Sequence, residues 1–214
     1  MNNVILFDTA RPGWANEEIG RREDVVRLGL WIFLATVTML FAAFTSAYIV
    51  RRSGVDWRPI ALPSVLWLNT LALAASSVAL EVARWGGTGK RWRAASVAFG
   101  AAVALGLAFL GGQVLAWRQL IAAGVYAPSS PHSSFFYMLT GVHGLHIVAA
   151  LVVLAWGAAK TWTGAGRRDQ RRWTALIGIC RTFWHFLGGV WIYLFVPAVG
   201  VLIRRRAMET GEAT

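Results

Sequence analysis

The sequence is poor in cysteine and in acidic residues. Its single cysteine, Cys180, excludes an internal disulfide and any metal site built from several thiolates. The 214 residues contain only 10 aspartates and glutamates, against 21 lysines and arginines. All of the acids except Glu81 fall near the chain ends or in the connections between apolar segments. The sequence therefore offers few carboxylates for acid–base chemistry within its apolar segments.

Several motifs of well-known functional classes are also missing. The segment "GGTGK" has neither the four-residue spacer nor the Ser or Thr of a phosphate-binding loop. No Gly-x-Ser-x-Gly segment occurs, which argues against an intramembrane serine protease. The chain also lacks an internal repeat and the paired Gly/Pro interruptions of many transporters.

What the sequence does have is a series of long apolar runs. It is 57% hydrophobic and only 14% charged, whereas a soluble domain has about 25% charged residues. A helix needs roughly 20 apolar residues to cross a bilayer, and a helix satisfies its own backbone groups in lipid. We therefore predict an all-α integral membrane protein, a five-helix bundle within residues 25–206. A lead-in (1–24) and a tail (207–214) flank helices expected at 25–50, 60–84, 94–118, 134–159 and 173–203.

The net charge of +11 is explained by the membrane rather than by nucleic acid. Basic residues gather at the ends of the apolar runs, where lipid headgroups and topology signals place them. More of them lie on the side of the N-terminus, although Arg204, Arg205 and Arg206 work against this asymmetry. The positive-inside rule thus predicts a cytoplasmic N-terminus and a C-terminus on the outer side, periplasmic or extracellular.

Histidines are the polar residues of most interest in the apolar runs. His143 and His146 are three residues apart, so they share one face of a helix. Together with His185 they could hold zinc or copper, because imidazole is a common metal ligand. No carboxylate is close in sequence to support such a site. The favoured interpretation is that they hydrogen-bond a neighbouring helix or lipid headgroups.

One acid, Glu81, lies at the margin of an apolar run. It precedes Arg84 by three residues, so the two side chains share a helix face. An ion pair at the membrane interface is the favoured interpretation, and a carboxylate of a proton relay is the alternative.

At this point the segments resemble a known family. "FFYMLTGVHGLHIVAALVVLAW" is similar to the signature of subunit III of haem-copper terminal oxidases. "RLGLWIFLATVTMLFAAFTSAYIVRR", "LPSVLWLNTLALAASSVALEVA", "FLGGQVLAW" and "RTFWHFLGGVWIYLF" resemble the first, second, third and fifth helices of its five-helix bacterial form. The resemblance covers all five expected helices in order.

The resemblance implies an accessory subunit without a catalytic centre or redox cofactor of its own. It implies a V-shaped bundle with phospholipid in a cleft, docked on subunit I beside subunit II in the bacterial inner membrane. Haem and copper belong to the partner subunits of this oxygen-reducing, proton-pumping complex, which takes electrons from cytochrome c or quinol. The family supports proton uptake and protects subunit I from inactivation. Candidates for lipid or interhelix contacts are Trp31, Trp67, Arg84, His143, His146 and His185.

The sequence also departs from the family. Three acids that the family commonly carries within the membrane are replaced by Val37, Ala116 and Gly188. These departures argue against a carboxylate-based proton role and suggest a divergent branch. Two alternatives stay open: the small membrane subunit associated with nitric oxide reductase, and a stand-alone metal or haem protein with three histidines.

Overall fold

The fold is entirely helical over the residues that the structure describes. The structure, a computed structural model, describes residues 13–54, 56–57, 60, 63–87, 92–163 and 170–209. Their regular elements are α1 (Gly13–Arg51), α2 (Val65–Gly87), α3 (Trp92–Ala122), the short 3-10 helix η1 (Ala127–Ser129), α4 (Pro131–Trp162) and α6 (Gln170–Glu209).

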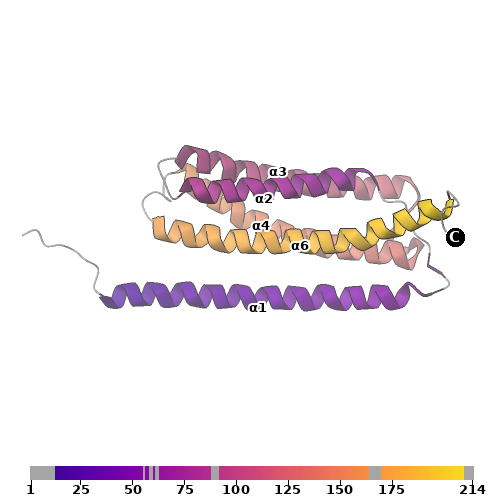
Figure 1. Ribbon diagram of the computed structural model, residues 1–214, viewed down its shortest axis with the longest axis horizontal. Helices are drawn as coiled ribbons and strands as arrows, with labels where there is room; N and C mark the ends of the chain where they lie inside the picture. Colours follow the sequence, from indigo (N-terminus) through magenta and orange to yellow (C-terminus); the bar gives the residue numbers. More distant parts are fainter. Residues whose placement is uncertain are drawn as a thin grey trace, which may run out of the picture.

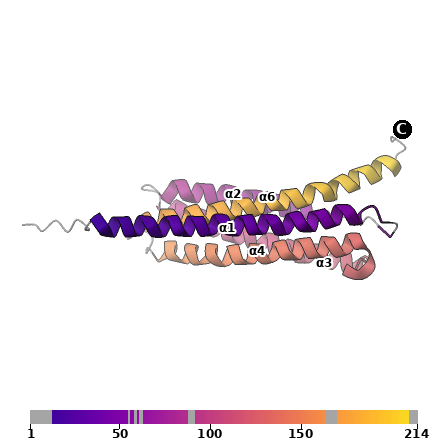
Figure 2. The same cartoon turned by 90° about the horizontal axis from the view of Figure 1, so that it is seen from below.

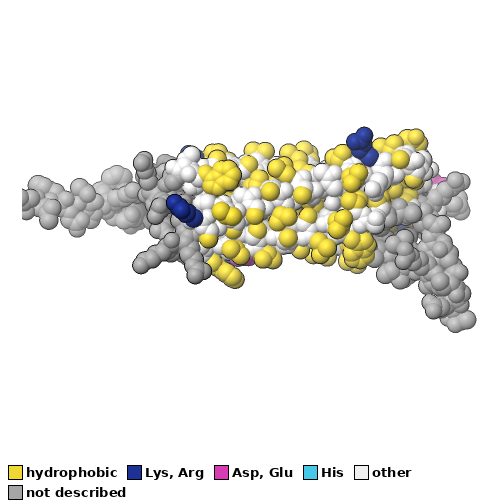
Figure 3. Space-filling model, turned by 90° about the horizontal axis from the view of Figure 1, so that it is seen from above, with side chains coloured by type: hydrophobic (Ala, Val, Ile, Leu, Met, Phe, Trp, Pro, Cys, Tyr) yellow, Lys and Arg dark blue, Asp and Glu magenta, His cyan; other side chains and the backbone are white. Residues whose placement is uncertain are grey.

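Five of these helices are long and apolar enough to cross a membrane. The crossing segments are Asp24–Arg51, Val65–Gly86, Arg93–Ala122, Pro131–Trp162 and Ala175–Val196. Figure 3 shows an apolar surface along the middle of the molecule, with basic side chains near its two ends. This distribution suits a bilayer, because its hydrocarbon core excludes charged side chains and its headgroups attract basic ones. The predicted all-α, five-helix membrane fold is confirmed.

Four of the helices form a closed bundle, and the fifth lies against one side of it. Helices α2, α3, α4 and α6 each pack on two neighbours within the ring, while α1 contacts only α4 and α6 among the described elements. Figures 1 and 2 show α1 running along the pair α4 and α6, beside the bundle. Successive helices alternate in direction, so α1 begins at one end of the molecule and α6 ends at the other. This arrangement follows from short connections between neighbouring helices.

Large apolar side chains fill the four-helix bundle. Trp184, Phe99 and Phe109 are completely buried there. Gly106 on α3 makes room for the first of them, because a Cβ at this position would lie 2.7 Å from Trp184 and 2.6 Å from Leu151. A small residue is therefore required where α3 approaches the core, as is common where helices pack in membranes.

Hydrogen bonds between helices add to this packing. The Trp117 indole on α3 donates to the Thr140 hydroxyl on α4 at 3.1 Å. The Trp191 indole on α6 donates to the Thr70 hydroxyl on α2, also at 3.1 Å. Buried indole N–H groups need such partners, because an unpaired polar group in an apolar interior is costly.

Helix starts differ from the predicted ones where proline is involved. Helix α4 begins at Pro131 rather than at residue 134. The Ser130 side chain caps it by accepting a hydrogen bond from the Ser133 amide, and proline suits the first helical position, where its missing N–H costs nothing. Helix α2 begins at Val65 rather than at residue 60, after a turn in which the Leu66 amide donates to the Pro63 carbonyl.

The remaining predicted boundaries concern the chain ends and the lipid cleft. Helix α1 already begins at Gly13, within the segment assigned to the lead-in, and α6 continues to Glu209 in the predicted tail. Residues 1–12 and 210–214 lie outside the described part of the chain. A V-shaped lipid cleft stays a prediction. The structure has an apolar pocket between α1 and the bundle, described below.

Candidate functional site

The most highly charged site within the crossing segments joins α2 to α6. Its four residues, Glu81, Arg84, Arg181 and His185, are called the Glu81 cluster below. The Glu81 carboxylate lies 2.9 Å from Nε2 of His185, 3.3 Å from the Arg181 guanidinium and 3.8 Å from that of Arg84. The carboxylate accepts hydrogen bonds from the first two groups, both on α6.

Helix geometry explains why these four groups meet. Arg84 follows Glu81 by three residues and His185 follows Arg181 by four, so each pair occupies one helix face. The packing of α2 on α6 brings the two faces together. The Glu81 and Arg181 side chains are half-buried, with 27% and 32% exposed, whereas those of His185 and Arg84 are more exposed, at 39% and 49%.

The charges of the cluster are only partly balanced. One carboxylate faces two guanidinium groups, and Nε of Arg181 is buried without a hydrogen-bond partner among the described residues. Charged groups in a crossing segment are costly unless they pair or reach the interface. Glu81 lies in the last third of α2, so the long Arg84 side chain can extend towards the headgroups. The site has spare hydrogen-bond donors for an anionic group.

The sequence predicted one contact of this cluster and missed two. The expected ion pair of Glu81 with Arg84 is present, but at 3.8 Å it is the longest of the three contacts. The contacts of the Glu81 carboxylate with Arg181 and His185 are not predicted from the sequence. The spacing of Arg181 and His185, with a basic and a titratable residue on one face of an apolar helix, was the available signal.

His143 lies in the centre of the bundle among aromatic rings. Its side chain is completely buried and stacks on Trp191 of α6 at a centroid distance of 5.6 Å. Phe109 of α3 and Phe41 of α1 meet the imidazole edge-on at 6.1 and 6.2 Å. Neither ring nitrogen has a hydrogen-bond partner among the described residues, so the predicted hydrogen bond to a neighbouring helix is not found. The interhelix contacts of His143 are aromatic instead.

His146 faces α1 rather than the bundle core. Its Nδ1 lies 2.8 Å from the Val142 carbonyl, which can only accept, so Nδ1 carries the proton. The half-exposed imidazole lies near the rings of Phe33 and Phe41, at 6.2 and 6.0 Å. These contacts hold α1 against α4. His146 is therefore an interhelix contact residue, with its hydrogen bond inside its own helix.

The three histidines considered as metal ligands have separate surroundings. His143 is in the core, His146 faces α1, and His185 contacts Glu81. In the described part of the chain, no three or more His, Cys, Asp or Glu side chains are grouped so that they could hold a metal ion.

The two tryptophan candidates lie on the outside of the bundle. Trp31 of α1 and Trp67 of α2 are both exposed by more than half. Trp67 also meets the Phe195 ring of α6 edge-on at 5.0 Å. Exposed indoles suit the membrane interface, since they combine an apolar ring with one polar group.

Two of the positions that lack the family's acids are buried contacts. Val37 packs near Phe41 and Leu139 where α1 meets α4, and Ala116 is completely buried on α3. These positions hold apolar packing in place of a titratable group. Gly188 on α6 has open space where a side chain would be, so packing does not by itself explain glycine there.

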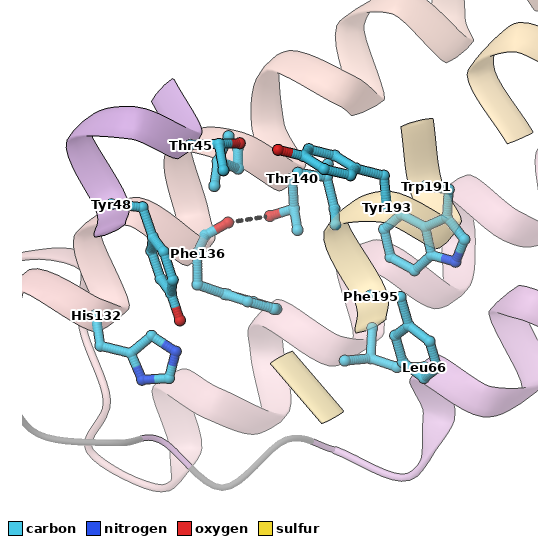
Figure 4. A pocket seen from close by; sticks show the side chains of 11 residues that line it. Thr45, Tyr48, Leu66, His132, Phe136, Thr140, Trp191, Tyr193 and Phe195 are labelled. Carbon is cyan, nitrogen blue, oxygen red and sulfur yellow. Dashed lines mark hydrogen bonds between the residues drawn. The ribbon is translucent and has the colours of Figure 1, made fainter. Parts of the chain in front are cut away.

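An apolar pocket separates α1 from the bundle at the end where α1 finishes. Its volume is about 630 Å³, open mouth included, and Figure 4 shows the side chains that line it. Aromatic and aliphatic groups dominate the wall, with Thr45 and Tyr48 from α1 and Thr140 from α4 as polar members. The other lining residues are Leu66, His132, Phe136, Leu139, Trp191, Tyr193, Leu194 and Phe195.

The fourth histidine fixes one wall of this pocket. His132 is buried at the start of α4, and its Nδ1 accepts a hydrogen bond from the Ile60 amide at 3.0 Å. Its ring stacks on Trp57 at 4.8 Å and lies 6.0 Å from the Tyr48 ring. His132 therefore ties the connection after α1 to α4. No spacing in the sequence links these distant segments, and His132 is not among the candidates predicted from it.

Comparison with known proteins adds a second line of evidence. The family model described as Cytochrome c oxidase subunit III matches residues 17–199. That range includes all five crossing segments and every residue of the Glu81 cluster. The match therefore extends over the whole five-helix region and does not rest on one apolar helix.

Individual relatives agree with the family match. A cytochrome bo(3) ubiquinol oxidase subunit 3 of Pseudomonas aeruginosa is 33% identical, over 90% of this chain and 93% of its own length. A probable cytochrome c oxidase subunit 3 of Mycobacterium tuberculosis is 30% identical, over 81% and 87% of the two chains. A cytochrome c oxidase subunit 3 of a Bacillus species is 27% identical, over 78% and 82%.

Proposed function

The chain belongs to the cytochrome c oxidase subunit III family, and on this basis we propose that it is a non-catalytic accessory subunit that stabilises subunit I of a bacterial haem-copper terminal oxidase. The complex reduces oxygen to water with electrons from cytochrome c or quinol and pumps protons. Haem and copper are held by the partner subunits, among them subunits I and II. The observation that carries the proposal is the family match across all five crossing helices.

The oxidase is favoured over the two alternatives. The relatives reported above are named as oxidase subunits, which supports an oxidase rather than nitric oxide reductase as the partner. A stand-alone metal protein would need converging ligands, whereas His143, His146 and His185 have separate surroundings. The relatives are named for both cytochrome c and ubiquinol oxidases, so either electron donor is compatible with the proposal.

We place the protein in the bacterial inner membrane with its N-terminus in the cytoplasm. The excess of basic residues on that side supports this orientation. Alternating helix directions then put the C-terminal end of α2, with the Glu81 cluster, on the cytoplasmic half. This is the side from which a proton-pumping oxidase takes its protons. The cluster thus provides a carboxylate and an imidazole on the uptake side, although Val37, Ala116 and Gly188 replace the family's acids.

Bound phospholipid is the second part of the proposal. The Arg84 guanidinium, which is 3.8 Å from the Glu81 carboxylate and whose side chain is 49% exposed, suits an anionic headgroup phosphate. Acyl chains would lie along the exposed apolar faces of α2 and α6, where Val78 and Ile192 are exposed. Lipid bound in this way would contact both α2 and α6 and stabilise their packing. This role extends to Arg84 and His185, two of the predicted contact residues.

Removing the subunit from its complex tests the accessory role. The oxidase is purified with the chain and, by mild detergent stripping, without it, and oxygen consumption is followed through many turnovers. The stripped complex should retain its haem spectrum and its initial oxygen reduction, but lose activity sooner during turnover. Adding back the purified chain is the control and should restore the longer lifetime. Immediate loss of haem from the stripped complex would contradict a non-catalytic, accessory role.

A further inference from the structure

Three buried amide or imidazole side chains in the bundle have polar atoms without hydrogen-bond partners among the described residues, in addition to the indole nitrogen of Trp184. They are Asn69 on α2, Gln113 on α3 and His143 on α4, and at most 3% of each residue is exposed. The atoms concerned are Nδ2 of Asn69, both amide atoms of Gln113 and both ring nitrogens of His143, which are unpaired among the described residues. Buried polar groups are nearly always paired with protein or with ordered water. These three therefore need an explanation.

Contacts between α3 and α4 place Gln113 beside His143. Phe109 meets the His143 ring at 6.1 Å, and Trp117 donates to Thr140 at 3.1 Å. Gln113 lies midway between these two α3 residues, one helical turn from each, and so on the same face. It consequently faces the stretch of α4 that runs from Thr140 to His143.

Asn69 approaches the same level of the bundle from α2. Its Oδ1 lies so close to Gly112 that a Cβ added there would collide with it. Gly112 directly precedes Gln113, so the Asn69 amide lies at the level of Gln113 on the neighbouring helix. Trp191, whose indole donates to the Thr70 hydroxyl, stacks on His143 from α6. Three polar groups from three helices thus lie at a similar level of an otherwise aromatic and aliphatic interior.

The geometry points to a buried hydration site: we propose that Asn69, Gln113 and His143 bind ordered water that bridges α2, α3 and α4. A neutral imidazole offers one donor and one acceptor, and each carboxamide offers both kinds. Water can match this mixed set, because a buried molecule typically makes about three hydrogen bonds. A cation suits it less, since Asn69, Gln113 and His143 themselves provide no carboxylate.

The apolar pocket adjoins the surroundings of this site. Thr140 and Trp191 form part of its wall, and both contact the surroundings of Gln113 and His143. Figure 4 shows these two side chains on the wall of the pocket. The pocket and the proposed site are thus separated by the side chains of Thr140 and Trp191. The proposal concerns the interior of this chain and does not depend on which oxidase is its partner.

High-resolution cryo-electron microscopy of the intact complex tests the hydration site directly. At a resolution where other buried waters are visible, we expect density about 2.7–3.2 Å from both the Gln113 amide and a His143 ring nitrogen. The variant His143→Phe keeps an aromatic ring on Trp191 and should lose this density. Absence of density in the unaltered protein, or a direct bond between the Gln113 amide and the imidazole, overturns the proposal.

A double-variant cycle gives an independent test. Gln113→Met and His143→Phe are made singly and together, and the temperature at which the chain unfolds in the complex is recorded. Each single change removes one hydrogen-bonding partner of the water and leaves the second side chain buried without a full set of hydrogen bonds. The double variant should therefore be no less stable than the less stable single variant. His146→Phe is the matched control, because its imidazole bonds within its own helix, and it should add to Gln113→Met. Losses that add for Gln113→Met and His143→Phe overturn the proposal.

Discussion

Nε2 of His185 on α6 lies 2.9 Å from a carboxylate oxygen of Glu81 on α2, which makes an acid and an imidazole direct partners across two crossing helices. The residues are 104 positions apart in the chain. Arg181 reaches the same carboxylate at 3.3 Å from one turn earlier on α6. The contact thus fixes α2 against α6 near the C-terminal end of the crossing segment of α2.

Replacing the acid should weaken the pairing of α2 with α6. Glu81→Gln keeps the shape of the side chain but leaves Arg84 and Arg181 without their counter-charge. Because the cluster is half-buried, we expect a loss of about 1–2 kcal/mol, between that of an exposed and a buried ion pair. Thermal release of the subunit from the complex measures this loss. Asp56→Asn is the control, since it breaks the more exposed pair with Arg51 and should have a smaller effect. If the two changes lower the temperature of subunit release equally, the Glu81 cluster contributes no more than an exposed ion pair.

Headgroup binding should depend on Arg84. The change Arg84→Gln removes the charge with the most exposed side chain in the cluster, and so should lower the amount of anionic phospholipid that stays with the complex. Native mass spectrometry of complexes released from mild detergent counts the retained lipids. Arg118→Gln is the matched control, because Arg118 is exposed on α3 outside the cluster. If both variants keep as much anionic lipid as the unaltered protein, Arg84 does not bind headgroups.

Truncating His143 should disturb packing without disturbing haem. His143→Ala removes a buried ring that contacts Phe41, Phe109 and Trp191, and comparable aromatic truncations cost about 3–5 kcal/mol. We expect looser association with subunit I but an unchanged visible haem spectrum in complexes that remain intact. His146→Ala, which truncates a half-exposed ring, should be milder. A lost haem signal in an intact complex would instead make His143 a ligand.

Carbodiimide labelling tests the absence of acids from the middle of the first crossing helix. These reagents modify carboxyl groups in apolar surroundings, and Val37 stands where the resemblance to the family implies a glutamate. Peptide mass spectrometry should therefore find no labelled residue between Leu28 and Val50. Asp24, at the start of the same crossing segment, and Glu81 show whether the reagent reaches exposed and paired acids. Strong labelling of Glu81 would contradict its pairing with Arg181 and His185, which should protect this carboxylate from the reagent.

The sequence predicts most of the fold because membrane crossing is a local property. Each apolar run contains enough information to specify one helix. The starts of α2 and α4 differ from the predicted ones near prolines: α2 begins after a turn at Pro63, and α4 begins at Pro131. The same local reasoning finds the contact of Glu81 with Arg84, since three-residue spacing sets one helix face.

Contacts between helices are where sequence reasoning stops. Nothing in the spacing says that α2 lies against α6, so the contacts of Glu81 with Arg181 and His185 could not be derived. The same applies to His132, which binds the Ile60 amide from 72 residues away. Apolar helices of similar composition can pack in many orders, and only side-chain fit selects among them. His143 illustrates the limit, because its aromatic contacts come from three other helices.

The partner composition and visible spectrum of the purified protein test the assigned role most directly. The chain is tagged and isolated in mild detergent from its native membrane, and the bound proteins are identified by mass spectrometry. Subunits I and II of a haem-copper oxidase should co-purify, with haem absorbance in the complex and none in the chain after it is separated from its partners. Haem or stoichiometric copper retained by the separated chain, or a nitric oxide reductase as its partner, would contradict its role as an accessory oxidase subunit.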